Sequence, residues 1–229
     1  FFAKGIIFVE GISEAILLPE IAKILDRPLE KYAVELVNVD SVAFSPFVNL
    51  FSSQNVQTCF SKVAIVTDDD RCTKKSETNY INKDFDYDDV NSDISGKLLS
   101  GTPSERCNEL ETSCRAVGIN VFKATKTLEY ALCCDENNIE YFIEAIKSEY
   151  SQLGPALEQK VNSLHDMNEK AACVWLFIRA REKCKGAIAQ YISQIIKKQC
   201  EMRKKGENIE KEFVIPDYLK EAVYCVTER

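Results

Sequence analysis

The chain has 229 residues and a mass of 26.0 kDa; 45% of the residues are hydrophobic, 28% are charged, and the formal net charge is −7. This composition is that of a globular protein with a full core, and it excludes a disordered, collagen-like or linker chain. No run of about 18 apolar residues and no basic segment ahead of an apolar one occurs, so we expect no membrane span, no signal peptide and a cytoplasmic protein.

Four short apolar runs follow one another along the chain and predict buried parallel strands. They cover residues 5–9, 33–39, 62–66 and 119–122. Helical patterns separate them: Ser13 is expected to cap one helix, which Pro19 should kink or delay, and another helix ends near Gly118. This alternation predicts an α/β fold, with a parallel sheet flanked by helices.

The chain divides into three parts on this reading. Residues 1–135 form the α/β core, residues 136–183 a small inserted helical subdomain, and residues 184–229 a return to the core. Within the core, residues 71–101 are rich in Asp, Asn, Ser and Lys, and we expect a polar insertion that is either a mobile active-site loop or a disordered excursion. Because the chain begins directly on a strand, we also expect it to be a piece of a longer protein.

Metal-binding and nucleophilic motifs are scarce. The ten cysteines are expected to be reduced thiols, since a chain of this size needs no disulfide framework. There is no C-x-x-C pair, and His165 is the sole histidine, which disfavours a structural zinc site and a histidine-dependent nucleophile. Gly96-Lys97 is followed by Leu98, so the chain has no P-loop.

Acidic residues follow three of the predicted strands. They are Glu10 and Glu14 after the first strand, Asp68 and Asp70 after the third, and Glu129 after the fourth. Ligands bind outside the carboxyl ends of parallel strands, and neighbouring carboxylates repel unless cations lie between them. Oxygen ligands alone favour Mg²⁺, Mn²⁺ or Ca²⁺.

The spacing of these acids adds support. In an extended backbone Asp68 and Asp70 point to one side and Asp69 to the other. Taken singly, each motif has an ordinary explanation, because D-x-D also occurs in solvated acidic turns and helix caps, and E-x-x-x-E occurs on any helix. Their joint occurrence at three strand ends predicts a shared metal site.

At this point the sequence resembles a known family. Glu10-Gly11 after one strand and Asp68-x-Asp70 after another are similar to the Toprim domain of topoisomerases, bacterial primases and several nucleases. With Glu14, Thr127-Leu128-Glu129 and Lys185-Gly186, the chain resembles more narrowly the Toprim region of OLD-family (overcoming lysogenisation defect) endonucleases.

The resemblance implies a nuclease half that nicks or cleaves DNA by a two-metal mechanism, with Mg²⁺ or Mn²⁺ and also Ca²⁺ as candidate ions. The family pattern assigns the metal ligands to Glu10, Glu14, Asp68, Asp70, Glu129 and Thr127. It makes Lys185 the basic catalytic residue, with Lys183 as a competing candidate, and Glu10 or Glu14 could double as general base. The implied partners are DNA and an N-terminal ABC-type ATPase domain of the same polypeptide, absent here, through which the protein would form a homo-oligomer. Phage defence would follow from family membership.

Two other functions stay open on the sequence. Asp68-x-Asp70 also fits a haloacid-dehalogenase-like phosphatase, in which Asp68 is the nucleophile and Asp70 the general acid. A non-catalytic Toprim assembly module is the third reading. The net charge of −7 argues against DNA binding unless bound ions and the cluster at 197–205, with Lys123 and Lys126, meet the phosphates; that cluster is equally well explained as a solvated helix end.

Overall fold

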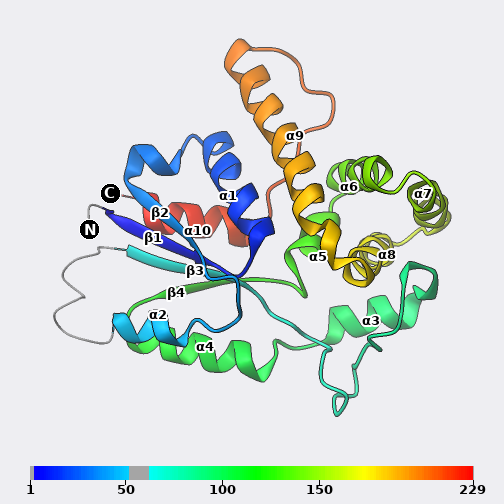
Figure 1. Cartoon of the computed structure of the whole chain (residues 1–229), viewed down its shortest axis with the longest axis horizontal. Helices are drawn as coiled ribbons and strands as arrows, with labels where there is room; N and C mark the ends of the chain where they lie inside the picture. Colours follow the sequence, from blue (N-terminus) through cyan, green and yellow to red (C-terminus); the bar gives the residue numbers. More distant parts are fainter. Residues whose placement is uncertain (1–2, 52–61, 229) are drawn as a thin grey trace.

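Four parallel strands form one sheet in the order β2-β1-β3-β4 (Figure 1). The computed structural model describes residues 3–51 and 62–228. The strands are β1 (Gly5–Val9), β2 (Val34–Asn38), β3 (Lys62–Asp68) and β4 (Asn120–Ala124), close to the predicted ranges. The predicted α/β fold is therefore confirmed.

Both faces of the sheet are buried, as expected of parallel strands. Ile6 and Phe8 of β1 belong to one apolar cluster, which α2 (Ser45–Leu50) and α4 (Glu105–Ala116) cover. Ile7 and Val9 point to the opposite face, where α1 (Ile12–Ile24) and α10 (Asp217–Thr227) pack (Figure 1). The alternation of side chains along a strand thus explains why every residue of β1 is apolar or glycine.

The helix after β1 differs in detail from the prediction. It begins at Ile12, with Gly11 at the cap position, so Ser13 does not cap it, and it continues through Pro19. Gly118 follows α4 with a φ of +78°, the left-handed conformation that glycine adopts readily, and the helix ends before it as predicted.

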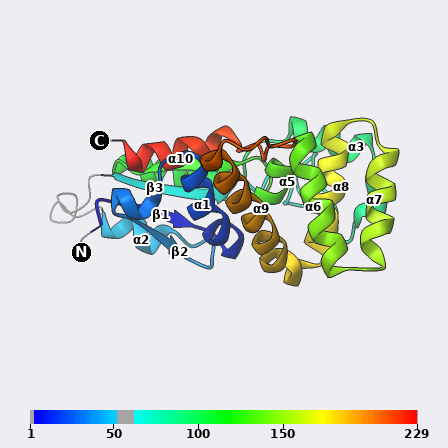
Figure 2. The same cartoon turned by 90° about the horizontal axis from the view of Figure 1, so that it is seen from above.

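A second group of helices lies beyond the carboxyl ends of the strands (Figures 1 and 2). It contains α5 (Leu128–Cys133), α6 (Glu136–Glu149), α7 (Leu153–Ser163) and α8 (Met167–Ala180). The long helix α9 (Lys185–Lys205) packs against both α1 and α6 and so joins this group to the sheet. Residues 136–183 are helical, as their periodicity indicates; the division of the chain into three domains stays a prediction.

Residues 71–101 differ from the prediction of an irregular loop, because the later part of the segment is helical. They contain the 3₁₀ turn η2 (Tyr87–Asp89) and the helix α3 (Ser92–Ser100), which contacts α8. Ile94 and Leu98 of α3 are buried, and the Arg181 Nη2 lies 2.8 Å from the Asp86 Oδ2. The few apolar residues among many polar ones are spaced to reach the helical group, and arginines from that group satisfy polar atoms of the segment.

The remaining elements are the 3₁₀ turns η1 (Leu29–Tyr32) and η3 (Glu182–Cys184). Nine cysteines lie in the described residues, and all nine are free thiols; Cys59 lies outside the described residues. None of the helices described is long and apolar enough to cross a membrane.

Candidate metal centre

Strand order brings the predicted acids together at the carboxyl edge of the sheet. Glu10 directly follows β1, and Asp68 ends β3, its neighbour in the sheet. Glu129 lies in the first turn of α5, which follows β4, the next strand along. With Glu14 from α1, these carboxylates line one cavity of about 310 Å³.

Hydrogen bonds hold three of these carboxylates in place. The Thr67 hydroxyl donates to the Glu10 Oε2 over 2.6 Å. The Leu128 backbone N–H at the start of α5 donates to the Asp68 Oδ1 over 2.8 Å, and the Ser13 hydroxyl donates to the Glu129 Oε1 over 3.3 Å. Each bond joins two segments that are far apart in the sequence, so the folded chain fixes the carboxylates relative to one another.

Ionisation of the carboxyl groups in the cavity is unfavourable. Burial, followed by the negative charge of Glu129, raises the pKa of Glu14 to about 7. Burial and then the charge of Glu14 raise the pKa of Asp68 well above its ordinary value. Carboxylates in such a place ionise at a cost that a nearby cation would remove.

Lys185, the first residue of α9, is the cation of the cavity. Its Nζ lies 3.9 Å from the Glu129 Oε1, and the Glu129 carboxylate is the main cause of a raised pKa of Lys185. Lys183 lies in η3 and is exposed, and it does not line the cavity. One lysine cannot neutralise five carboxylates, since Asp40 also lines the cavity with the four described above.

Two expected ligands lie outside the cavity lining. The chain leaves the extended conformation after β3, and Asp70 has a φ of +50°. The Asp70 Oδ2 pairs with the Arg106 Nη2 at 2.7 Å and does not line the cavity. The Thr127 hydroxyl accepts a hydrogen bond from the Tyr130 N–H and so caps α5.

Asp69 points away from the cavity, as the sequence pattern predicts. Its carboxylate is buried and accepts hydrogen bonds from the Lys126 N–H and from the Nε and Nη2 of Arg71. The Lys126 Nζ donates to the Arg71 carbonyl oxygen, and Lys123 pairs with Glu111. Both lysines are thus engaged within the fold.

Sequence reasoning missed several polar groups of this edge. The sequence does point to Thr67 as a residue of this edge, because it directly precedes Asp68 and a side chain on a strand points to one face of the sheet. It does not point to Arg106 and Tyr218, because each comes from a distant helix. The Tyr218 hydroxyl is buried with no hydrogen-bond partner among the described residues, and burial together with the charge of Asp68 raises its pKa well above its ordinary value.

The side chains of the cavity meet the requirements of a metal ion in part. Within residues 3–51 and 62–228, no group of three or more His, Cys, Asp or Glu side chains is arranged to hold a metal ion. The donor set nevertheless fits a hard divalent cation, because the cavity offers carboxylate oxygens, no imidazole and no thiolate. Two of these carboxyls also carry raised pKa values, which a bound cation would lower.

Comparison with known proteins agrees with this geometry. Residues 1–70 match the family described as "Overcoming lysogenization defect protein-like, TOPRIM domain". No curated protein matches the chain.

Solved structures with a similar fold cover the whole chain. One is the C-terminal region of the Xanthomonas campestris pv. campestris OLD protein phased with iodine, with a TM-score of 0.60 and 20% identity over 100% of this chain and 96% of that one. Another is the C-terminal region of the Burkholderia pseudomallei OLD protein, with a TM-score of 0.57 and 22% identity over 99% of this chain and 98% of that one. The resemblance drawn from the motifs is confirmed, and the chain has the fold of these C-terminal regions.

Proposed function

We propose that this chain, which carries a Toprim domain of the OLD-like kind and has the fold of OLD C-terminal regions, is a metal-dependent DNA endonuclease. The observation that carries the proposal is the convergence of Glu10, Glu14, Asp68 and Glu129 with Lys185 in one cavity. Raised carboxyl pKa values in that cavity support a role for a cation there.

The acids of the cavity would share the work of holding the ions. Glu10, Asp68 and Glu129 are fixed by hydrogen bonds and are suited to ligation. Asp70 would join them on leaving Arg106, and Thr127 contributes its position at the start of α5. When bound, a pair of Mg²⁺ or Mn²⁺ ions supplies a reactive water near neutral pH and neutralises charge at the leaving oxygen.

The other side chains would handle protons and phosphate charge. Glu14 lines the same cavity, and its carboxylate is suited to accept a proton from an attacking water. The Lys185 ammonium faces the cavity and would bind a phosphate oxygen, which neutralises charge that develops during cleavage. Histidine is not needed in this scheme.

DNA and an N-terminal ABC-type ATPase domain are the proposed partners. The resemblance to C-terminal regions of OLD proteins supports the second. The net charge of −7 makes the ions and Lys185 the main attraction for the scissile phosphate, because Lys123 and Lys126 are engaged within the fold. We therefore expect modest, strongly salt-dependent affinity for DNA.

The test is incubation with supercoiled plasmid in Mg²⁺, Mn²⁺, Ca²⁺ or EDTA. We expect nicked or linear DNA with the ions and none with EDTA. Asp68→Asn should slow cleavage about 100-fold or more, because it removes a central ligand while keeping the shape of the side chain. Asp88→Asn, at an exposed aspartate of η2, is the matched control and should cleave like the wild type.

Other results would select another function. Full activity of Asp68→Asn would overturn the assignment of the centre. Release of phosphate from a small phosphomonoester, with intact plasmid, would select the phosphatase. No reaction with either substrate would select the non-catalytic assembly module.

A further inference from the structure

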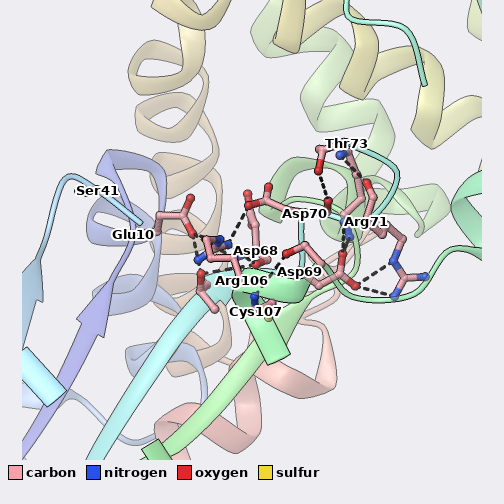
Figure 3. A network of polar contacts seen from close by, with 12 residues as sticks. Glu10, Ser41, Asp68, Asp69, Asp70, Arg71, Thr73, Arg106 and Cys107 are labelled. Carbon is pink, nitrogen blue, oxygen red and sulfur yellow. Dashed lines mark hydrogen bonds and ion pairs between the residues drawn. The ribbon is translucent and has the colours of Figure 1, made fainter. Parts of the chain in front are cut away.

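Arg106 lies beside two of the expected metal ligands. It is the second residue of α4, and its Nη2 is 2.7 Å from the Asp70 Oδ2 and 3.9 Å from the Glu10 Oε2. The same nitrogen donates to the Asp68 carbonyl oxygen over 3.0 Å. Figure 3 shows the guanidinium between the carboxylates of Glu10 and Asp70.

The guanidinium is poorly satisfied in this position. Its Nε and Nη1 are buried and have no hydrogen-bond partner among the described residues. Buried donors without acceptors cost free energy, and a guanidinium has five N–H groups to place. A single nitrogen therefore makes all of the polar contacts of Arg106.

Arg71 lies at the same edge of the sheet, and each nitrogen of its guanidinium has a hydrogen-bond acceptor. Its Nε and Nη2 both donate to the Asp69 Oδ2, and its Nη1 donates to the Leu98 carbonyl oxygen. All three nitrogens of Arg71 are engaged. By contrast, the attraction of two carboxylates holds Arg106, without the full set of hydrogen bonds that a permanent structural ion pair makes.

The position of Arg106 also explains the position of Asp70. Asp70 does not line the cavity, because its carboxylate is paired with Arg106 on the α4 side. Glu10 does line the cavity and lies within ion-pair distance of the same nitrogen. A positive charge thus lies between two carboxylates of the expected ligand set, where a divalent ion would need both.

We propose that Arg106 is a built-in counter-ion that competes with a divalent metal ion for Asp70 and Glu10. The inference rests on the proposed metal centre. The guanidinium balances the two carboxylates when no ion is bound, and it leaves them when an ion binds. The side chain is 28% exposed, so it has room to turn toward solvent.

The experiment measures Mn²⁺ binding directly, by the loss of the free-ion signal in electron paramagnetic resonance. Arg106→Gln and Arg106→Met, made in parallel, remove the charge with different effects on packing. We expect the dissociation constant for Mn²⁺ to fall about threefold to tenfold in either variant, the range of a partly buried ion pair. Circular dichroism checks that each variant is folded.

Lys123→Gln is the matched control. It removes one positive charge and one ion pair to α4, that with Glu111, and leaves the acidic edge untouched. Its dissociation constant for Mn²⁺ should equal that of the wild type. Equal tightening in Lys123→Gln and Arg106→Gln would reveal a general field effect and overturn the proposal.

Thermal unfolding gives a second readout that does not depend on cleavage. Without metal, Arg106→Gln should melt below the wild type, because Asp70 and Glu10 lose their counter-ion. With saturating Mn²⁺ the difference should close. A difference that persists unchanged in Mn²⁺ would make Arg106 a structural residue and overturn its competing role.

Failure of this inference and failure of the metal centre are distinguishable. If the wild type binds Mn²⁺ and both folded Arg106 variants bind it no more tightly, only the role of Arg106 is overturned. If neither the wild type nor any Arg106 variant binds Mn²⁺, the metal centre fails and this inference with it.

Discussion

Two lysines near the start of α9 have different surroundings, although they are two residues apart. Lys185 lines the acidic cavity, with its Nζ 3.9 Å from the Glu129 Oε1, whereas Lys183 in η3 is exposed. Of the two, Lys185 alone lines the cavity that the carboxylates form. The choice between them, which the motif leaves open, thus has a geometric basis.

We expect Lys185→Ala to slow plasmid cleavage about 100-fold, because on the proposed function it removes the positive charge that would bind a phosphate oxygen. Lys183→Ala is the matched control and should keep the wild-type rate. Initial rates of nicking in Mn²⁺ measure both. Loss of activity in Lys183→Ala with retention in Lys185→Ala would contradict the assignment.

Ser13 shows how one residue can be assigned to the wrong task from sequence alone. A serine after a strand and before an apolar helical pattern is a good N-cap, yet α1 begins one residue earlier. The Ser13 hydroxyl donates to Glu129, 116 residues away, instead. The partner is visible only once the fold brings the first turns of α1 and α5 together.

At the scale of elements, α9 connects the cavity with both the sheet and the helical group. It contacts α1 on the sheet and α6 in the helical group, and its first residue is Lys185. A helix of 21 residues extends about 30 Å. The basic residues of its last turns therefore lie far from the cavity and at the opposite end of α9 (Figure 1).

The contact between α6 and α7 depends on a glycine. A Cβ on Gly154 of α7 would lie 2.6 Å from the Lys147 Cα of α6, and the clash is with backbone, which cannot turn away. The small residue lets the two helices approach closely. The requirement is invisible in the sequence, where Gly154 reads as a helix breaker or turn residue.

Gly154→Ala should lower the free energy of unfolding by about 1–3 kcal/mol, because the added methyl forces α6 and α7 apart. Gly96→Ala, in α3, is the control: a Cβ there meets nothing within 4 Å. It should raise the free energy of unfolding by about 0.5–1 kcal/mol through helix propensity. Urea unfolding measures both, and wild-type stability of Gly154→Ala would contradict the packing argument.

At the scale of the whole molecule, assembling the sheet concentrates charge that the unfolded chain keeps apart. The fold buries Glu14 and brings carboxylates from α1, β3 and α5 to one cavity, and burial followed by the charge of Glu129 raises the pKa of Glu14 from 4.5 to about 7. The folded state then holds the Glu14 proton more tightly than the unfolded chain does. Stability must therefore depend on pH through this group.

The direction of this pH dependence follows from the difference in bound protons between the folded and unfolded states. Between pH 4.5 and about 7 the unfolded chain has lost the Glu14 proton and the folded chain keeps it, so the free energy of unfolding of the metal-free protein falls as pH rises. Above about pH 7 the folded chain has lost this proton too, and the free energy of unfolding stops falling through this group. The glutamine of Glu14→Gln cannot ionise. In EDTA at pH 8, the free energy of unfolding of this variant should therefore exceed that of the wild type by about 1–3 kcal/mol.

Urea unfolding followed by circular dichroism at pH 4.5 and pH 8 measures this difference. The gap between Glu14→Gln and wild type should be smaller at pH 4.5, where Glu14 is protonated in the folded state and about half protonated in the unfolded chain. A wild type as stable as Glu14→Gln at pH 8, or a gap that grows toward low pH, would contradict the electrostatic argument.

The sequence by itself determined the sheet and the identity of its acidic edge. Short apolar runs such as 5–9 and 62–66 favour a strand buried on both faces, because they are short and rich in β-branched residues. Parallel strands end at one edge, so Glu10, Asp68 and Glu129 had to converge once the sheet existed. The Toprim resemblance followed from the same residues.

Only the tertiary structure decided the contacts between distant segments. The polar segment at 71–101 folds because Arg181 and the apolar face of α8 meet it, and its own composition predicts no such partners. Asp70 pairs with Arg106, 36 residues later, and does not line the cavity with Asp68, since the chain turns where an extended strand was expected. Patterns along a chain reveal local periodicity; the pairing of charges depends on distances in space, which the packing of helices on the sheet sets.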